Sequence, residues 1–274
     1  MNFLFFLIFS FIMGLILGSF FNVLIYRIPR NESIIKPPSH CPFCNNYLKI
    51  WENIPLISYI ILKGRCSHCK NKISIQYPLV EILTAILCVF LYLFIIIPFL
   101  SSKHSIFEIT FLILKLTILL ITIPVSIIDL FYFIIPDCFT IPFLIIAFLF
   151  SFFPGDISPI QSLLGILIGA GILLLAGLIG EYILKKKESM GGGDIKLMAV
   201  FGALFGGQIS FLTIFLASLI GSVLGLILLL LKKMPNEHKI PFGPFLSLGL
   251  WLSVLLYEKL ILFYHSFIDF LINL

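Results

Sequence analysis

Long apolar runs separated by short polar stretches dominate the pattern of positions along this chain of 274 residues. The runs are continuous and do not alternate, which favours membrane-spanning helices over the strands of a β-barrel. We expect eight spans, at 3–26, 78–100, 106–128, 138–153, 159–184, 195–206, 208–231 and 242–264. The predicted fold is therefore an all-α polytopic membrane protein of about eight transmembrane helices.

Two of these expectations depend on further argument. The run 138–153 is short for a span. The stretch 195–231 can form one long helix or two short ones, and at ~1.5 Å per residue it crosses a core of ~30 Å twice only where the bilayer is thin. Because lysine clusters flank this stretch on both sides, we expect two crossings that turn at Gly206-Gly207-Gln208.

Composition and charge agree with a membrane protein. Hydrophobic residues make up 60% of the chain and charged residues only 11%, which is too little polar surface for a soluble domain. The net charge of +5 marks orientation and not nucleic-acid binding, because the cations gather in a few loops. The first run has no basic residue before it and exceeds 20 residues, so we expect a span and not a cleaved signal peptide.

The distribution of basic residues predicts the orientation. With the N-terminus outside, the cytoplasmic loops are 27–77, 129–137, 185–194 and 232–241. These loops and their edges then hold 15 of the 18 basic residues: Arg27, Arg30, Lys36, Lys49, Lys63, Arg65, Lys70, Lys72, Lys185, Lys186, Lys187, Lys196, Lys232, Lys233 and Lys239. This asymmetry is the signal that fixes the cytoplasmic face of a membrane protein.

The polar insertion 27–77 carries four cysteines in two C-x-x-C pairs: Cys41, Cys44, Cys66 and Cys69. Each pair can point two thiolates at one ion, and two pairs complete the tetrahedral four-sulfur site typical of structural Zn²⁺. Two disulfides or free thiols are the alternative, but a cytoplasmic loop disfavours disulfides. Since four sulfurs fill the site, we expect His40 and His68 to be exposed neighbours. Such a loop can also bind nucleic acid, but this one lacks an interleaved aromatic and basic stripe.

Two aspartates stand at the edges of apolar runs, where charges are costly and are functional candidates. Asp129 follows the run 106–128, at a helix end where the dipole disfavours negative charge. Asp194 follows Met190-Gly191-Gly192-Gly193, so its alternative role is the N-cap of the next helix. Two carboxylates brought together share a proton, and the pair can then activate water and protonate a scissile carbonyl. The three glycines allow positive φ and close approach of a substrate backbone.

Other charged residues lie in or near the spans. We expect Glu81 and Glu181 at the cytoplasmic edge, where they reach the interface or pair with lysines. Lys115 lies deeper and has no evident partner in the sequence. Asp137, after Pro136, is a candidate N-cap for the run that follows it.

Short motifs extend in a fixed order over nearly the whole chain. They are Gly18 to Pro29, the two C-x-x-C pairs, Tyr77-Pro78-Leu79-Val80-Glu81, Asp129 with Ile135-Pro136-Asp137, Gly191 to Leu197, and Pro241-Phe242-Gly243-Pro244-Phe245. In this order the chain resembles the bacterial type IV prepilin peptidases, a family of membrane aspartyl peptidases with a G-x-G-D motif. The resemblance implies that Asp129 and Asp194 are catalytic and that the cysteines form a cytoplasmic zinc loop.

The resemblance also implies substrates and a second activity. Family members cut the short leader from type IV prepilins and pseudopilins after a glycine, at the cytoplasmic face of the inner membrane. These substrates serve pili, competence fibres and type II secretion. Many members then methylate the new N-terminus with S-adenosylmethionine, and the zinc loop is typical of those two-function members. This chain has no G-x-G-x-x-G nucleotide fingerprint, so the S-adenosylmethionine site stays unassigned.

These inferences predict three regions: a first transmembrane helix at 1–26, a cytoplasmic zinc-binding loop at 27–77 and a transmembrane aspartyl peptidase bundle at 78–274. The expected partners are prepilin or pseudopilin substrates and membrane lipid, with no nucleic acid. A peptidase without methyltransferase activity is one alternative. A membrane transporter with a zinc-ribbon loop is another, but transport carboxylates lie near the midplane of the bilayer. A third alternative, a zinc-ribbon adaptor without activity, leaves the aspartate pair unexplained.

Overall fold

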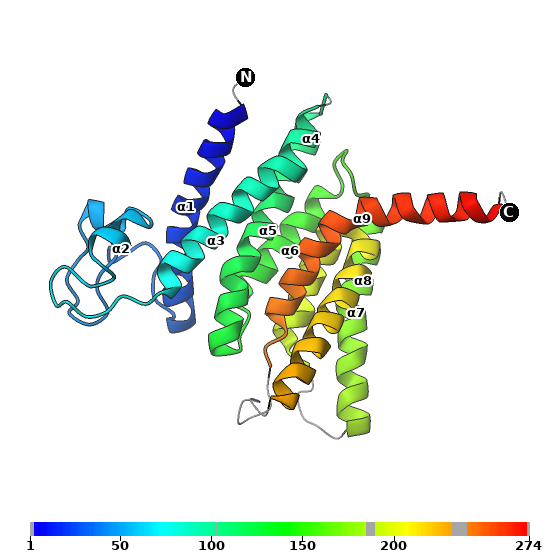
Figure 1. Ribbon diagram of the computed structural model, residues 1–274. Coiled ribbons are helices and arrows are strands. Elements are labelled where there is room, and N and C mark those ends of the chain that lie inside the picture. Colours follow the sequence, from blue (N-terminus) through cyan, green and yellow to red (C-terminus); the bar gives the residue numbers. More distant parts are fainter. Residues whose placement is uncertain (1–2, 102, 185–189, 232–239, 273–274) are drawn as a thin grey trace. The chain divides into compact units, whose positions relative to one another are not determined.

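The computed structural model describes residues 3–101, 103–184, 190–231 and 240–272. Within this part of the chain the structure is helical, and its extended pairing is limited to two isolated bridges. Contacts between residues divide the chain into two compact units, Met1–Lys103 and His104–Leu274 (Figure 1).

The first unit packs two spans through a glycine-lined contact. Its helices are α1 (Phe3–Arg27) and α3 (Gln76–Leu91), and α3 continues through the π-helical turn η3 (Tyr92–Ile96) into α4 (Ile97–Leu100). A Cβ atom on Gly14 or Gly18 would fall 2.5 Å or 2.6 Å from the Cα atom of Ala85 or Glu81. The two helices therefore approach more closely than larger residues allow, as small residues permit in membranes.

The polar insertion between these spans folds into the short helices η1 (Ile28–Arg30), η2 (Ile50–Asn53) and α2 (Ile57–Ile61). Buried charged side chains fasten it to the spans. Arg27 of α1 donates to the carbonyl oxygens of Ser33 and Pro37 at 2.8 Å and 2.7 Å. Glu81 of α3 accepts the backbone N–H of Leu56 at 2.9 Å. The prediction that Glu81 reaches the interface or a lysine is wrong, because its carboxylate binds the insertion itself.

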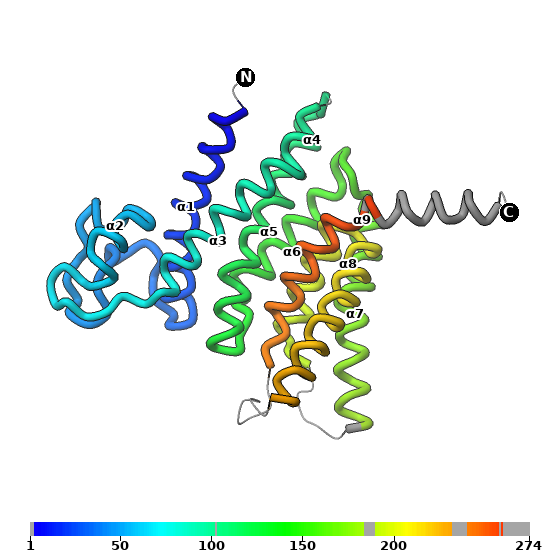
Figure 2. The backbone as a smooth tube through the Cα atoms, in the orientation of Figure 1, coloured from blue at the N-terminus to red at the C-terminus, as the bar shows by residue number. Residues whose placement is uncertain are grey.

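The second unit is a bundle of long helices. They are α5 (Ile106–Tyr132), α6 (Asp137–Phe150), α7 (Pro159–Leu184), α8 (Gly192–Leu230) and α9 (Gly243–Ile272). α8 packs against α6, α7 and α9, and α5 packs against α9. The tube in Figure 2 follows the chain through these helices. α8 therefore packs against three of the other four long helices of this unit.

α8 contains the predicted reversal. Gly206 has φ 79° and ψ 174°, a conformation that glycine adopts readily and that interrupts the helix. Both halves of α8 approach the start of α9: Gly221 lies against Phe245 of α9, and Asp194 lies beside the carboxylate that binds Gly243. The chain therefore traverses the unit twice between Gly192 and Leu230, as the sequence predicts.

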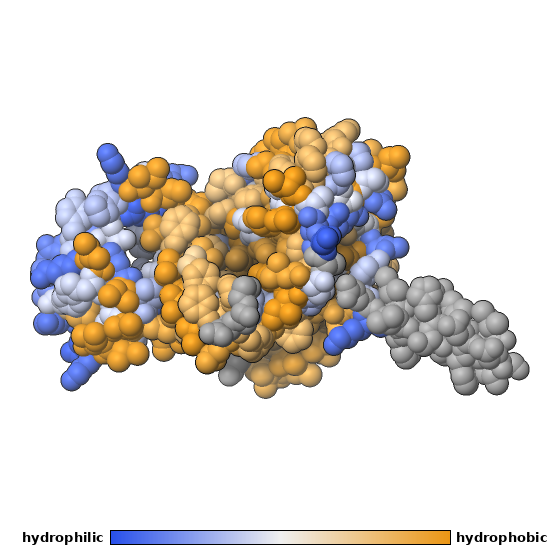
Figure 3. All heavy atoms as spheres, turned by 90° about the horizontal axis from the view of Figure 1, so that it is seen from above, coloured by the Kyte–Doolittle hydropathy of each residue, from blue (hydrophilic) through white to orange (hydrophobic). Residues whose placement is uncertain are grey.

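The described helices fit the predicted membrane class. Five are long and apolar enough to cross a bilayer, namely Phe3–Arg30, Gln76–Leu100, Ile106–Tyr132, Pro159–Ile183 and Gly192–Leu230. Asp137–Phe150 and Gly243–Tyr257 are shorter apolar helices. With α8 divided at Gly206, the described chain provides eight apolar helical segments, and the predicted fold class is confirmed. Apolar side chains dominate the surface of these helices in Figure 3.

The bounds of several predicted spans change. The run at 138–153 forms a helix that ends at Phe150, the run at 106–128 continues to Tyr132, and α8 begins at Gly192. The lysines at 185–187 and 232–233, and Lys239, lie outside the described residues.

Candidate functional site

Asp129 lies in the last turn of α5, where its side chain is buried with only 6% exposed. The helix continues for three more residues to Tyr132, and its C-cap Phe133 has a left-handed conformation with φ 57°. The Oδ2 atom of Asp129 accepts the backbone N–H of Gly243, the first residue of α9, at 2.9 Å. A Cβ atom on Gly243 would lie 2.7 Å from the same oxygen. Glycine at this position therefore leaves room for the carboxylate.

Asp194 is the third residue of α8 and is 8% exposed. The helix begins at Gly192 with Gly191 as its N-cap, so the interpretation of Asp194 as the N-cap is wrong. Its Oδ1 atom is buried and has no hydrogen-bond partner among the described residues. Its carboxyl group lies close enough to that of Asp129 for the two to interact electrostatically. The structure therefore brings the two aspartates together at one end of the second unit.

The three glycines before Asp194 have different surroundings. A Cβ atom on Gly191 would lie 2.6 Å from the Oδ2 atom of Asp194, and one on Gly193 would lie 2.8 Å from the Cβ atom of Ile135. A Cβ atom on Gly192 would meet nothing within 4 Å. None of the three has a positive φ, so the prediction of a positive-φ turn is wrong. Glycine is needed for close packing at the first and third positions.

An ion pair joins the start of α8 to the start of α6. The Nζ atom of Lys196 lies 2.7 Å from the Oδ1 atom of Asp137, and both side chains are about half exposed. Asp137 is the first residue of α6 and Pro136 is its N-cap, so the predicted N-cap role of Asp137 is wrong. Together with the contact of Gly193 and Ile135, this pair holds the start of α8 against the connection between α5 and α6.

Sequence reasoning missed two residues of this site. Gly243 and Lys196 lie within the motifs of the sequence, but the motifs alone give neither residue a role at the aspartate pair. For Lys196 a signal existed, because it lies two residues after one candidate aspartate and is opposite in charge to Asp137. For Gly243 the only signal was its place between Phe242 and Pro244, because a backbone donor leaves no mark in the sequence.

The two C-x-x-C pairs of the first unit form similar turns. The N–H of Cys41 donates to the carbonyl oxygen of Asn46 at 3.0 Å, and the N–H of Cys66 donates to that of Asn71 at 2.9 Å. Each cysteine therefore begins a tight loop whose closing bond spans five residues. The two loops are the knuckles predicted from the spacing, and they face each other.

The four sulfur atoms lie within 4.8 Å of one another. Across the two knuckles, the Sγ atoms of Cys41 and Cys69 are 3.8 Å apart, and those of Cys44 and Cys66 are 4.0 Å apart. A tetrahedral ion with metal–sulfur bonds of ~2.3 Å requires sulfur–sulfur separations of roughly 3.8 Å. All four cysteines are free thiols. The cluster therefore fits one tetrahedral metal ion and contains no disulfide.

The neighbouring histidines are not part of the cluster. His68 is exposed and His40 is half-buried, and the described metal-binding group consists of cysteines alone. A hydrogen bond from the backbone of Cys69 lowers the pKa of Cys66 to about 7. Burial raises the pKa of Cys41 to about 11. The backbone of the second knuckle thus favours the thiolate form that binds metals.

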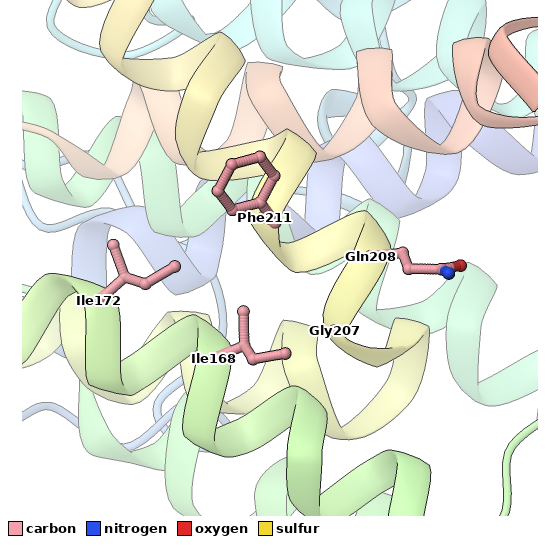
Figure 4. A pocket seen from close by; sticks show the side chains of 5 residues that line it. All are labelled: Ile168, Ile172, Gly207, Gln208 and Phe211. Atoms are coloured by element: carbon pink, nitrogen blue, oxygen red, sulfur yellow. The ribbon is translucent and has the colours of Figure 1, made fainter. Parts of the chain in front are cut away.

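Two further features of the second unit carry no candidate chemistry. Lys115, which had no partner in the sequence analysis, pairs with Asp156 at 2.8 Å and lies 5.1 Å from the ring of Phe111. A groove of about 510 Å³ lies beside the reversal of α8. It is lined by Ile168, Ile172, Gly207, Gln208 and Phe211 (Figure 4). Its lining is mostly apolar and holds no titratable side chain.

Comparison with known proteins assigns the family. Residues 12–95 match the bacterial Peptidase A24 N-terminal domain, and residues 114–226 match the type IV leader peptidase family. The prepilin leader peptidase/N-methyltransferase of Pseudomonas aeruginosa is 32% identical over 292 residues, covering 97% of this chain and 95% of its own length. The chain belongs to the type IV leader peptidase family. The predicted resemblance is therefore confirmed.

Other members of the type IV leader peptidase family agree. Proteins of the same name from Aeromonas hydrophila and Neisseria gonorrhoeae are 35% and 33% identical. They cover 89% and 88% of this chain and 89% and 87% of their own lengths. No solved structure gives a significant match. The apolar helices and these relatives together identify a multi-pass membrane protein.

Proposed function

We propose that this protein cleaves the leader of type IV prepilins or pseudopilins, using Asp129 and Asp194, and N-methylates the new N-terminus. The observation that carries the proposal is the meeting of two buried carboxylates at one end of the second unit, within the segment that matches the peptidase family. The name shared by the relatives supports both activities.

The location of the aspartates favours a peptidase over a transporter. Asp129 lies in the last turn of α5, and Asp194 lies in the first turn of α8. Both carboxylates therefore lie at the ends of spans, where the peptide bond just before an apolar helix can reach them. Transport carboxylates lie near the middle of the bilayer.

The surroundings of the pair suggest a division of roles. The N–H of Gly243 stabilises negative charge on Asp129. Asp194 is buried beside that charge and has no described donor on Oδ1. Two carboxylates this close share one proton. In our proposal Asp129 carries the charge and Asp194 carries the proton.

The reaction then balances without a further group. Asp129 takes a proton from water as the water oxygen bonds to the carbonyl carbon of the glycine before the cut. Asp194 gives its proton to the carbonyl oxygen, which yields a gem-diol. When the diol collapses, the C–N bond breaks, Asp194 recovers a proton from one hydroxyl, and Asp129 returns its proton to the leaving amine.

The cysteine cluster fits a structural Zn²⁺, which we propose as its ion. Cys41, Cys44, Cys66 and Cys69 would fill all four positions of a tetrahedral site, so the metal has no open position for chemistry. Its role would be to stabilise an insertion that has few buried apolar residues. The residues that hold S-adenosylmethionine, the methyl donor, stay unassigned within the described chain.

We also propose that the protein lies in the bacterial inner membrane with the aspartates at the cytoplasmic face. The support comes from the positions of basic residues in the sequence. Lys196 follows Asp194 by two residues, and the insertion between α1 and α3 is rich in lysine and arginine. Basic residues concentrate on the cytoplasmic side of membrane proteins.

The test is mass spectrometry of a full-length prepilin after incubation with the purified protein, with and without S-adenosylmethionine. We expect cleavage after the glycine in both samples and a methyl group on the new N-terminus only when the donor is present. Cleavage without methylation would support the alternative of a peptidase alone. Absence of cleavage by zinc-loaded protein across several prepilins would contradict the proposal.

A further inference from the structure

The insertion between α1 and α3 exposes large apolar side chains in a short segment. These residues, here called the apolar patch, are Ile50, Trp51, Ile54, Ile57, Ile60 and Ile61. Ile50 is 92% exposed, Ile60 71% and Ile61 64%. An exposed group of large apolar residues on a polar loop marks an interaction surface.

The local structure gathers the apolar patch. Ile57, Ile60 and Ile61 follow the spacing that places side chains on one face of a helix, and they form the outer face of α2. The remaining members lie on or just after η2 (Ile50–Asn53), which contacts α2. Glu52 of η2 is buried, so the acidic side chain of this segment is directed away from the exposed face.

Basic residues surround the apolar patch. Residues 28–75 contain seven basic residues and two acidic ones. Lys49 and Lys63 are exposed and flank the patch, and the ammonium group of Lys49 lies 6.0 Å from the ring of Trp51. Isoleucine, tryptophan and lysine together are the composition of segments that lie in the interface of an anionic membrane.

The insertion that carries the apolar patch is also fastened to the ends of two spans. Leu56, in the middle of the patch, donates its backbone N–H to Glu81 in the second turn of α3. Arg27, at the end of α1, holds the other part of the insertion through Ser33 and Pro37. The segment thus lies beside the end of a span and does not extend away from it.

We propose that the apolar patch docks on the bilayer surface from which α1 and α3 emerge. The isoleucines and Trp51 enter the boundary between headgroups and acyl chains, and Lys49 and Lys63 bind anionic headgroups. This contact holds the cysteine knuckles against the membrane. The proposal goes beyond the peptidase reaction and does not depend on it.

Trp51 is a native probe for this contact, because the chain has only two tryptophans. The full-length Trp251→Phe protein, reconstituted in vesicles of phosphatidylethanolamine and phosphatidylglycerol, isolates the fluorescence of Trp51. We expect lipids brominated near the headgroup end of the acyl chain to quench this fluorescence, and aqueous acrylamide to quench it weakly. If Trp251→Phe does not fold, subtracting the fluorescence of Trp51→Phe from that of wild type gives the same Trp51 signal.

A matched pair of variants tests the apolar patch itself. Ile60→Ser with Ile61→Ser should raise acrylamide quenching of Trp51 at least about twofold, because the segment loses its apolar anchor. Ile34→Ser with Ile35→Ser removes two exposed isoleucines outside the patch and should change nothing. Zinc content confirms that each insertion is folded. Replacing phosphatidylglycerol by phosphatidylcholine should weaken quenching by brominated lipid.

Two results would overturn the proposal. Strong quenching of Trp51 by acrylamide in every vesicle composition, with none by brominated lipid, would show that the apolar patch is exposed to water and does not touch the bilayer. Protection of Trp51 from both quenchers would show that protein covers the patch. The fluorescence of Trp51 distinguishes these two results from the predicted one. It is measured in folded Trp251→Phe protein or as the difference between wild type and Trp51→Phe, so no patch variant is needed.

Discussion

The backbone N–H of Gly243 binds the Oδ2 atom of Asp129 across 114 residues of sequence, at a distance of 2.9 Å. The bond joins the last turn of α5 to the start of α9. It orients one candidate catalytic carboxylate, and a side chain on the donating residue would crowd the acceptor.

Gly243→Ala should therefore lower cleavage. Its Cβ atom would lie 2.7 Å from Oδ2 of Asp129, so the carboxylate must move. A shift of this size in a reacting group costs up to about 100-fold in kcat/KM. Gly171→Ala, in α7, is the control, since a Cβ atom there meets nothing within 4 Å. Equal activity of both variants in a prepilin cleavage assay would contradict the positioning role.

The glycines before Asp194 should respond differently to alanine. Gly193→Ala places a Cβ atom 2.8 Å from that of Ile135, whereas Gly192→Ala places one in open space. Because helix starts tolerate alanine and open space adds no clash, Gly192→Ala should keep cleavage within about twofold. Gly193→Ala should lose at least about tenfold, since the start of α8 must shift. Comparable loss in both would show that flexibility, and not packing, requires these glycines.

The ion pair of Lys196 and Asp137 should affect activity more than stability. Both side chains are about half exposed, and such pairs contribute about 0–1 kcal/mol to the free energy of unfolding. Lys196→Met and Asp137→Asn should each lower kcat/KM with little change in thermal unfolding, and the double variant should lose no more than either alone. Lys115→Met, which breaks the pair with Asp156 far along α5, should lower stability and leave kcat/KM of the folded protein unchanged.

Additive losses in Lys196→Met and Asp137→Asn would contradict the coupling. Loss of kcat/KM in Lys115→Met would show that distant ion pairs affect cleavage generally.

The cysteine cluster should lose its metal as the pH falls. Each thiol must release its proton before it binds zinc, so metal binding competes with protons. The pKa of Cys66, lowered to about 7 by the backbone of Cys69, means that this ligand is protonated below that value in the metal-free protein. Zinc measured after gel filtration should be retained at higher pH and released at acid pH. The metal's own charge keeps its ligands deprotonated well below their free pKa values.

Substitution identifies the ligands. Cys66→Ser should lose zinc at neutral pH, whereas Cys88→Ser and Cys138→Ser should keep it, because those two residues lie outside the cluster. Retention of zinc by Cys66→Ser, with the other three cysteines intact, would contradict a four-sulfur site.

The sequence predicts the helices and the cysteine cluster well, for physical reasons. Apolar runs must become helices in a bilayer, because every backbone polar group needs a partner there. Gly206 is recognisable because a chain of this length must turn to return to the same face. The C-x-x-C spacing brings the two cysteines of each pair together locally. Cys41 and Cys66 can therefore be assigned as ligands without information on distant contacts.

Interactions across the fold could not be predicted in the same way. The partner of Lys115 is Asp156, 41 residues away, and many acidic residues were equally possible. Glu81 binds a backbone N–H at Leu56, a donor present at almost every residue. The alternative N-cap role of Asp194 is wrong because Gly191 takes the N-cap position, which the succession of glycines concealed.

The central claim is that Asp129 and Asp194 together cleave the leader. The direct measurement is mass spectrometry of a prepilin incubated with wild type, Asp129→Asn and Asp194→Asn, each reconstituted and each shown to be folded by zinc content and thermal unfolding. The account predicts cleavage by wild type and no detectable cleavage by either folded variant, because each carboxylate holds or receives a proton that the amide cannot. Cleavage by either folded variant at a rate near that of wild type would contradict it.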